Sequence, residues 1–234
     1  ENLKNGGSFP EGNWSPASLA RAISTGTNAP IFNGTVYGNL EWNMPGQTSL
    51  LSNFFNKDIS FNNVNLISTN SANANGELRV RTGGSAGIFT MTVNGNLTVS
   101  ANARLVTTSS TVTAGNGGSI AVKGNIINNG TVTSNGVIGT LNNFSIAGSA
   151  PQTFSNSGTF FGGNLLFAMN NAAGLTLLTP LTLPWNADFV AGKIATTAAN
   201  ILIMNDNMVY TGGSVNSFVS GPMKKIGNSA FVFN

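Results

Sequence analysis

Side chains that could perform chemistry are few in this chain and lie far apart. The sequence has no histidine and no cysteine. This excludes Ser-His-Asp and Cys-His catalysis, disulfides, and metal sites built on histidine or thiolate. It has seven acids, none closer than ten residues to another: Glu1, Glu11, Glu41, Asp58, Glu77, Asp188 and Asp206. Because glycosidases of the usual kind need a close carboxylate pair, we predict that the chain is not an enzyme and binds no cofactor.

A coiled fold could still bring distant acids together. Asp58 and Glu77 lie about one turn of such a fold apart, but Glu77 is followed two residues later by Arg79, so a surface ion pair is the simpler interpretation. Asp206 is a single carboxylate in a turn-forming segment, and one carboxylate makes a weak calcium site. We therefore predict no metal site.

The charge and hydropathy pattern limits the kinds of partner that the chain is expected to bind. Only 7% of the residues are charged, and the net charge is +3. The dense basic spots are Arg79 with Arg81 and Lys224 with Lys225, whereas a nucleic-acid groove needs many clustered phosphate contacts. No apolar run reaches the roughly 18 residues that a membrane-spanning helix requires. We expect neither nucleic-acid binding nor a membrane span.

Aromatic and threonine side chains supply the remaining candidate sites. Carbohydrate could stack on Tyr37, Trp42 and Trp185, although large aromatics of this kind also pack in cores. A Thr-x-Thr pattern recurs three times at an almost even spacing, and stacked outward threonines could form an ice-binding face. Its candidate residues are Thr90, Thr92, Thr111, Thr113, Thr131 and Thr133.

These residues must be positioned by short β-strands. Apolar and polar residues alternate over residues 78–81, 89–93, 97–100, 120–123, 144–146, 181–183 and 231–233, which indicates half-buried strands. The alternation predicts that Val122, Ile146 and Leu183 are buried and that Thr92, Lys123 and Thr182 face outward. Asn-Gly and Gly-Gly steps separate the strands and favour sharp turns.

Two architectures fit this pattern, an antiparallel β-sandwich and a parallel solenoid. A Gly-Asn-Leu/Ile phrase recurs at residues 38–40, 95–97, 124–126 and 163–165, and the threonine spacing of about 20 residues suggests one coil of a β-helix. Stacked asparagines can hydrogen-bond along the axis, which suits a chain with 36 asparagines and few charges. We predict an all-β, right-handed parallel β-helix, with the antiparallel sandwich as the alternative.

The first 30 residues have a different pattern. Ser15 is a plausible helix N-cap, Pro16 suits the first helical position, and Leu19 and Ile23 fall four residues apart. We predict a cap segment over residues 1–30 with a short helix at 15–24, followed by the β-helix over 31–234. The chain begins with Glu1 and ends inside a strand-like pattern, so we expect a mature or excised segment whose solenoid continues beyond residue 234.

The second half resembles a known class of repeat. The residues that carry the resemblance are 152–159, 163–165, 170–177, 180–183, 191–194 and 218–228. Their succession is similar to the β-helical repeat regions of very large Bacteroidota surface proteins. The resemblance implies an extracellular, adhesin-like or structural segment that is exported by the type 9 secretion machinery and contacts surface polysaccharide or other surface proteins. It implies no site residues, because the family pattern is structural.

Overall fold

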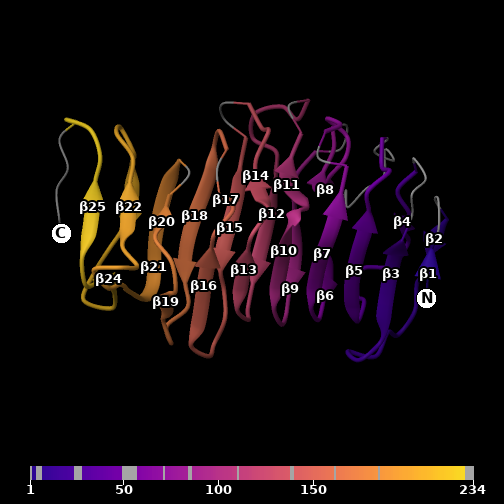
Figure 1. The fold of residues 1–234 in the computed structure, drawn as a ribbon, viewed down its shortest axis with the longest axis horizontal. Helices are drawn as coiled ribbons and strands as arrows, with labels where there is room; N and C mark the ends of the chain where they lie inside the picture. The colour runs from indigo at the N-terminus through magenta and orange to yellow at the C-terminus, as the bar shows by residue number, and fades with distance from the viewer. Residues whose placement is uncertain are drawn as a thin grey trace.

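The protein is an all-β parallel solenoid. The computed structural model describes residues 2–3, 7–23, 28–48, 57–70, 72–83, 86–109, 111–137, 140–160, 162–183 and 185–229. Within these ranges the chain forms 25 strands and no helix. The coils follow one another from the N-terminal to the C-terminal end of an elongated body for about eight turns (Figure 1).

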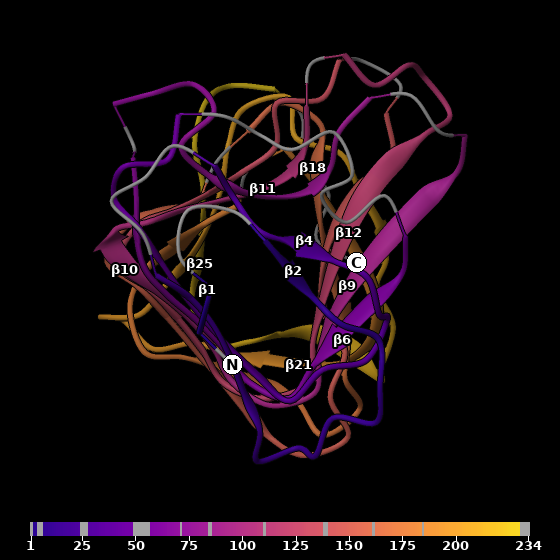
Figure 2. The same cartoon turned by 90° about the vertical axis from the view of Figure 1, so that its right-hand side faces the viewer.

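The strands form three faces around one interior, as the view along the long axis shows (Figure 2). Face 1 comprises β1 (Asn2–Leu3), β3 (Leu19–Ile23), β5 (Asn39–Met44), β7 (Val64–Thr69), β10 (Leu97–Asn102), β13 (Ile126–Asn128), β16 (Gln152–Asn156) and β19 (Leu175–Leu177). Face 2 comprises β8 (Leu78–Arg81), β11 (Arg104–Thr108), β14 (Thr131–Thr133) and β17 (Thr159–Phe160). Face 3 comprises β6 (Ile59–Phe61), β9 (Ile88–Val93), β12 (Gly117–Val122), β15 (Asn142–Ile146) and β18 (Leu165–Asn170).

Shorter strands complete the two ends. At the N-terminal end, β2 (Ser8–Phe9) pairs with β4 (Ile31–Phe32). Near the C-terminal end, β21 (Asn186–Ala195) pairs with β18 in its first half and with β19 in its second, so it passes from face 3 to face 1. It turns at Gly192, where φ is 90° and a Cβ would overlap the carbonyl of Asn171. The remaining strands are β20 (Leu181–Thr182), β22 (Leu202–Met204), β23 (Tyr210–Gly212), β24 (Ser217–Ser220) and β25 (Met223–Lys225).

The strand pairing decides between the two predicted architectures. Every pair of named strands is parallel, and the antiparallel contact in the described residues is a single bridge between Ser214 and Ser217. The solenoid prediction is confirmed and the antiparallel sandwich is wrong. The strand predicted at residues 231–233 lies outside the described residues.

Coil length varies widely. Arg21 and Glu41, which pair between neighbouring coils, are 20 residues apart, whereas Asn63 and Asn96, which also pair between neighbouring coils, are 33 residues apart. The Gly-Asn phrases at 38–40, 95–97 and 124–126 do mark equivalent places, because Leu40, Val64, Leu97 and Ile126 occupy one column of face 1. The first two phrases are two coils apart, and the phrase at 163–165 lies on face 3 instead.

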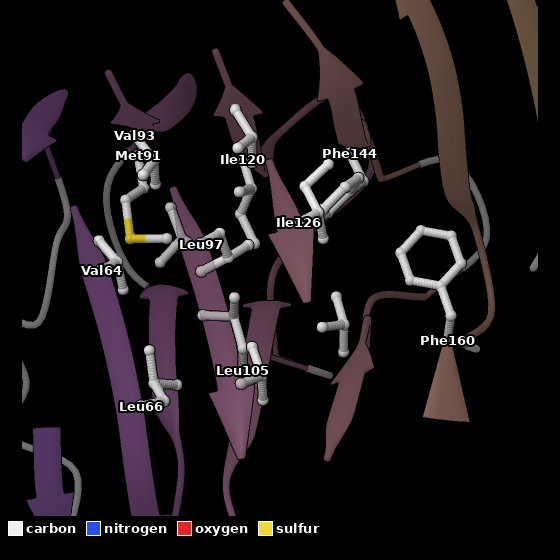
Figure 3. Close-up of a cluster of buried hydrophobic side chains, with 14 of the residues drawn as sticks. Val64, Leu66, Met91, Val93, Leu97, Leu105, Ile120, Ile126, Phe144 and Phe160 are labelled. Carbon is white, nitrogen blue, oxygen red and sulfur yellow. The ribbon is translucent and has the colours of Figure 1, made fainter. Parts of the chain in front are cut away.

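The core is a stack of inward-pointing columns. Val122 pairs with Val93 on one side and Ile146 on the other, and Figure 3 shows neighbouring apolar side chains of adjacent coils meeting in the interior. As predicted, Val122, Ile146 and Leu183 are fully buried, Lys123 is exposed, and Thr92 and Thr182 are half-buried on the outer side. Alternation therefore separates core from surface at these positions, whereas all four residues of β8, Leu78–Arg81, are buried.

Polar side chains also connect the coils. At the start of the face 1 strands, the Oδ1 atoms of Asn39, Asn63, Asn96 and Asn125 each accept a hydrogen bond from the backbone N–H of the next coil, at 3.2, 2.7, 2.8 and 2.9 Å. We call these four residues the asparagine ladder. The residue before Asn125 is Gly124, where a Cβ would lie 2.5 Å from the carbonyl group of Gly95. This close approach explains why glycine precedes asparagine in the repeated phrase.

A second polar link is buried. The Nε2 of Gln152 donates to the carbonyl of Val122 at 3.1 Å, and its Oε1 accepts from the side-chain Nδ2 of Asn171 at 2.8 Å. Asn171 also donates to the carbonyl of Ala150 at 2.8 Å and accepts from the backbone N–H of Ala173 at 2.9 Å. Both amides are almost fully buried. Their hydrogen bonds span three successive coils.

The predicted N-terminal helix is wrong. Residues 19–23 form strand β3, which pairs in parallel with β5, and Ser15 lies in a turn in which its carbonyl accepts from the N–H of Ser18 at 2.8 Å. The inward residues are Ala20 and Ala22, so the period is two, and Leu19 with Ile23 lie on the outer side. Pairing with β5 satisfies the backbone along its whole length, which outweighs a weak local helix signal.

Aromatic side chains fill the N-terminal end in place of a helix. Phe9, Trp14, Phe32, Tyr37 and Phe61 form one cluster with ring centroids 4.9–6.4 Å apart. Because β3 belongs to face 1, the described residues before and after position 30 share one sheet.

The buried amide link gives a stability test. We expect Asn171→Ala to lower the free energy of unfolding by about 2–3 kcal/mol, because it leaves buried partners unsatisfied. The matched control is Asn170→Ala at the exposed neighbouring position, which should change it by about 0.5 kcal/mol or less. Urea denaturation of both variants measures the difference. Equal effects would show that the amide link contributes nothing specific.

Candidate functional site

Two of the three aromatic residues proposed for carbohydrate contact lie in the core. Trp42 is fully buried, and Tyr37 is 3% exposed, stacked on Phe61 at 5.6 Å. The Tyr37 hydroxyl donates to the carbonyl of Phe9 at 3.3 Å and accepts from a backbone N–H at 2.7 Å. Trp185 is 47% exposed. The prediction of an aromatic sugar-binding face is therefore wrong for Tyr37 and Trp42, whose side chains pack in the interior.

The threonine pairs do not form a stacked face. Thr90 and Thr92 lie on β9 of face 3, where Ser119 and Ala121 are their neighbours in the next coil. The second pair, at 111 and 113, lies in the loop before β12, and the third, at 131 and 133, lies on β14 of face 2.

Coil length explains why the threonine pairs separate. Gly87 and Asn116, which are hydrogen-bonded between neighbouring coils just before β9 and β12, are 29 residues apart. The spacing between successive threonine pairs is shorter than this coil. Each pair therefore lies less than one turn after the previous pair, at a different place around the solenoid. The predicted ranks of Thr111, Thr113, Thr131 and Thr133 therefore do not align.

The described acids do not assemble a metal site or a carboxylate pair. Asp58 accepts a hydrogen bond from the backbone N–H of Thr90 beside face 3 at 2.8 Å, whereas Glu77 directly precedes β8 of face 2. Asp206 lies in a turn, as its sequence context indicated, and it also pairs with Lys225 at 2.9 Å. Within the described ranges, no group of three or more His, Cys, Asp or Glu side chains could hold a metal ion.

The chemically unusual place is instead a buried charged cluster on face 2. The side chain of Glu77 is 0% exposed, and it forms ion pairs with Arg79, which is 8% exposed, and with Arg104 of the next coil. The Nη1 of Arg104 lies 3.2 Å from the Glu77 Oε2. The sequence predicted the Glu77–Arg79 pair but placed it on the surface, and it gave Arg104 no role.

Register explains why Arg104 joins the cluster. Leu78 of β8 pairs with Leu105 of β11, so the residues that precede them, Glu77 and Arg104, are neighbours in adjacent coils. A whole coil separates these two positions in the sequence. The pairing of Glu77 with Arg104 could be predicted from the sequence only if the length of this coil were known. The threonine spacing suggested a shorter coil.

Loops between the strands cover the cluster. The carbonyls of Asn75 and Glu77 each accept a hydrogen bond from the buried Nε2 of Gln47 at 3.0 Å, which fixes the loop before β8. The Nη2 of Arg104 donates to Asn135 Oδ1 at 3.3 Å, which fixes the loop after β14. The outer side of face 2 is thus partly enclosed.

A pocket opens over this cluster. Its volume is about 510 Å³, within the range typical of small-molecule sites. Its walls come from β8, β11, the loop before β8 and the loops after β11 and β14. The residues that line it are Ala74, Asn75, Arg79, Arg104, Ser109, Thr111 and Asn135. The polar groups that a ligand would meet are therefore guanidinium, amide and hydroxyl groups, beside a nearly equal apolar surface. We call this feature the arginine pocket.

Burial controls the electrostatics of the pocket floor. It raises the pKa of the Glu77 carboxyl above its ordinary value of 4.5, and the charges of Arg79 and Arg104 oppose that shift. Burial also lowers the pKa of Arg79. With Glu77 ionised, the two guanidinium groups leave the floor with one net positive charge.

A third arginine lies at the end of β8, next to the cluster. Arg81 is 1% exposed, donates to the carbonyl of Gly87, and lies 4.9 Å from the ring centroid of Phe89. Its guanidinium group therefore links the end of β8 to β9, and Arg81 is not among the residues that line the pocket. We assign it a structural role.

The aromatic assignments give a direct test. We expect Trp42→Ala to lower the free energy of unfolding by about 3–5 kcal/mol, because it empties a large volume in the core. Trp185→Ala should cost about 0.5 kcal/mol or less, because that ring is half exposed. Thermal unfolding followed by circular dichroism compares the two. A Trp42→Ala variant as stable as the Trp185→Ala variant would contradict the core assignment.

Comparisons with other proteins give no relative from which a function could be transferred. No family model, curated protein or solved structure matches this chain. Among the described residues there is also no helix that is long and apolar enough to cross a membrane.

Proposed function

We propose that this chain is a non-catalytic structural or adhesive segment of a secreted bacterial cell-surface protein. The observation that carries the proposal is the continuous coil-to-coil pairing, in which face 1 runs without interruption from β1 to β19 and on through β21 to β24. Each coil contacts its neighbours through backbone hydrogen bonds, so length can be added or removed by whole coils. Such a body is suited to hold other modules at a distance.

The composition of the surface supports an extracellular location. The outward positions carry mostly Asn, Ser, Thr and Gly, and the chain keeps only 7% charged residues. Stacked like charges would repel each other along the axis, whereas stacked amides form the asparagine ladder. The chain has no cysteine, so its stability relies on stacking and not on disulfides. The resemblance to Bacteroidota surface repeats adds the type 9 secretion route. The expected right-handed winding of the solenoid follows the general preference of parallel strand connections.

The location can be tested in the bacterium that produces the parent protein. Antibodies raised against the purified chain should label intact cells, and inactivation of the type 9 secretion machinery should remove the label. A cytoplasmic protein, probed in parallel, controls for lysis. Labelling that appears only after the cells are broken would refute the extracellular location.

The proposed role of holding other modules at a distance, which we call the spacer role, predicts that one coil can be removed. Deletion of residues 97–125 joins Asn96 to Ile126 and restores the Gly-Asn-Ile sequence that already occurs at 124–126. Because Asn96 and Asn125 occupy equivalent positions in the ladder, we expect a folded chain that unfolds cooperatively.

The control is a deletion of residues 97–111, which removes about half a coil. It should unfold the chain, because it removes β10 and β11 and brings β12 of face 3 to the position that β10 of face 1 occupied. Circular dichroism and thermal melting distinguish the two variants. If the one-coil deletion also unfolds, the coils are not interchangeable and the spacer role fails.

A further inference from the structure

The arginine pocket has positive charge that its own acid does not cancel. Glu77 pairs with both Arg79 and Arg104, so the floor carries two positive charges against one negative charge. Arg104 is the more accessible of the two, with 24% of its side chain exposed. Buried charges are usually paired, because an uncompensated charge in a low-dielectric site is costly. The excess charge is therefore a site that an anion would stabilise.

Both guanidinium groups retain donors for a ligand. A guanidinium has five N–H donors. Arg79 directs its Nε and Nη2 to Glu77, and Arg104 uses Nη1 for Glu77 and Nη2 for Asn135. Because arginine presents its donors in a planar fork, it binds carboxylate and sulfate oxygens through two hydrogen bonds at once.

The rest of the lining indicates what the anion is attached to. A pocket of about 510 Å³ is much larger than a lone oxyanion requires. Besides the arginines and Ala74, its walls present the amides of Asn75 and Asn135 and the hydroxyls of Ser109 and Thr111. Amides and hydroxyls both donate and accept hydrogen bonds, as sugar hydroxyl groups do. The described lining includes no aromatic ring, so stacking on a neutral sugar is not its mode of recognition.

We propose that the arginine pocket binds an acidic saccharide, with Arg104 and Arg79 holding its carboxylate or sulfate and the surrounding amides and hydroxyls holding its ring hydroxyl groups. The proposal rests on the pocket alone and goes beyond the spacer role. A purified chain could bind such a sugar wherever the parent protein is located, so the two proposals can fail separately.

Glu77 makes the binding depend on pH. Among the described residues, the charged groups that face its carboxyl are Arg79 and Arg104. As the pH falls through the raised pKa of Glu77, the carboxyl becomes neutral and the floor gains a second net positive charge. The affinity for an anion should therefore increase toward lower pH as long as the sugar acid stays ionised.

Calorimetric titration of the purified chain tests the site. We expect trigalacturonate or a sulfated carrageenan disaccharide to bind and maltotriose, an uncharged trisaccharide, not to bind. Which acidic sugar binds more tightly distinguishes carboxylate from sulfate recognition. Arg104→Gln should weaken binding at least about tenfold, because it removes a charge-assisted contact. Asn135→Ala, which keeps both arginines, should weaken it less.

The matched control is Arg21→Gln. Arg21 also pairs with a glutamate of the next coil, Glu41 at 2.7 Å, but it lies on face 1 outside the pocket. This variant should bind like the unmodified chain. Glu77→Gln should bind more tightly at about pH 8 and lose the dependence on pH, and circular dichroism verifies that each variant is folded.

Four results would overturn the proposal. The first is no binding of either acidic saccharide, and the second is equal binding of maltotriose. The third is inorganic sulfate binding as tightly as both acidic sugars, which would reduce the pocket to a simple ion site. Weakening by Arg21→Gln equal to that by Arg104→Gln would also contradict it, because the attraction would then be general charge. If Arg104→Gln does not fold, the binding of the acidic saccharides, maltotriose and inorganic sulfate to the unmodified chain still decides the outcome.

Discussion

Hydrogen bonding between successive coils is the constraint on which the rest of this structure depends. No single coil can bury its apolar side chains, and no strand of the described residues is longer than ten residues. Stacking satisfies the backbone of each strand and closes the core at the same time. The asparagine ladder and the buried link between Gln152 and Asn171 extend this pairing to side chains at the corners. The outward-facing sequence can then vary, provided that each corner returns the chain to register.

The arginine pocket is a consequence of that freedom. Coils differ in length by more than ten residues, and the additional residues form loops outside the faces. Where loops from neighbouring coils meet over face 2, they enclose Glu77, Arg79 and Arg104 without disturbing the inward column of Leu78 and Leu105. The scaffold thus tolerates a buried charged cluster because the cluster lies behind the sheet and not within the core.

The sequence predicted the class of fold because its signals are local. Alternation over a few residues identified the inward side chains, including Val122 and Ile146, and the Gly-Asn phrase marked a corner that requires a close backbone approach. Prediction from the sequence failed where a local signal competed with strand pairing between coils. The helix signal at residues 15–24 was overridden by pairing of β3 with β5, and Trp42 could not be assigned to the core until its strand was placed.

The sequence by itself determined that the chain has short strands with alternating apolar and polar residues, and that histidine and cysteine chemistry are excluded. Only the tertiary structure decided which residues meet across coils. Because the separation of paired positions varies between coils, from 20 residues at Arg21 and Glu41 to 33 residues at Asn63 and Asn96, sequence spacing does not reveal which positions stack. That is why the evenly spaced threonines separate onto different faces, whereas Glu77 and Arg104, which no motif connects, come together in one pocket.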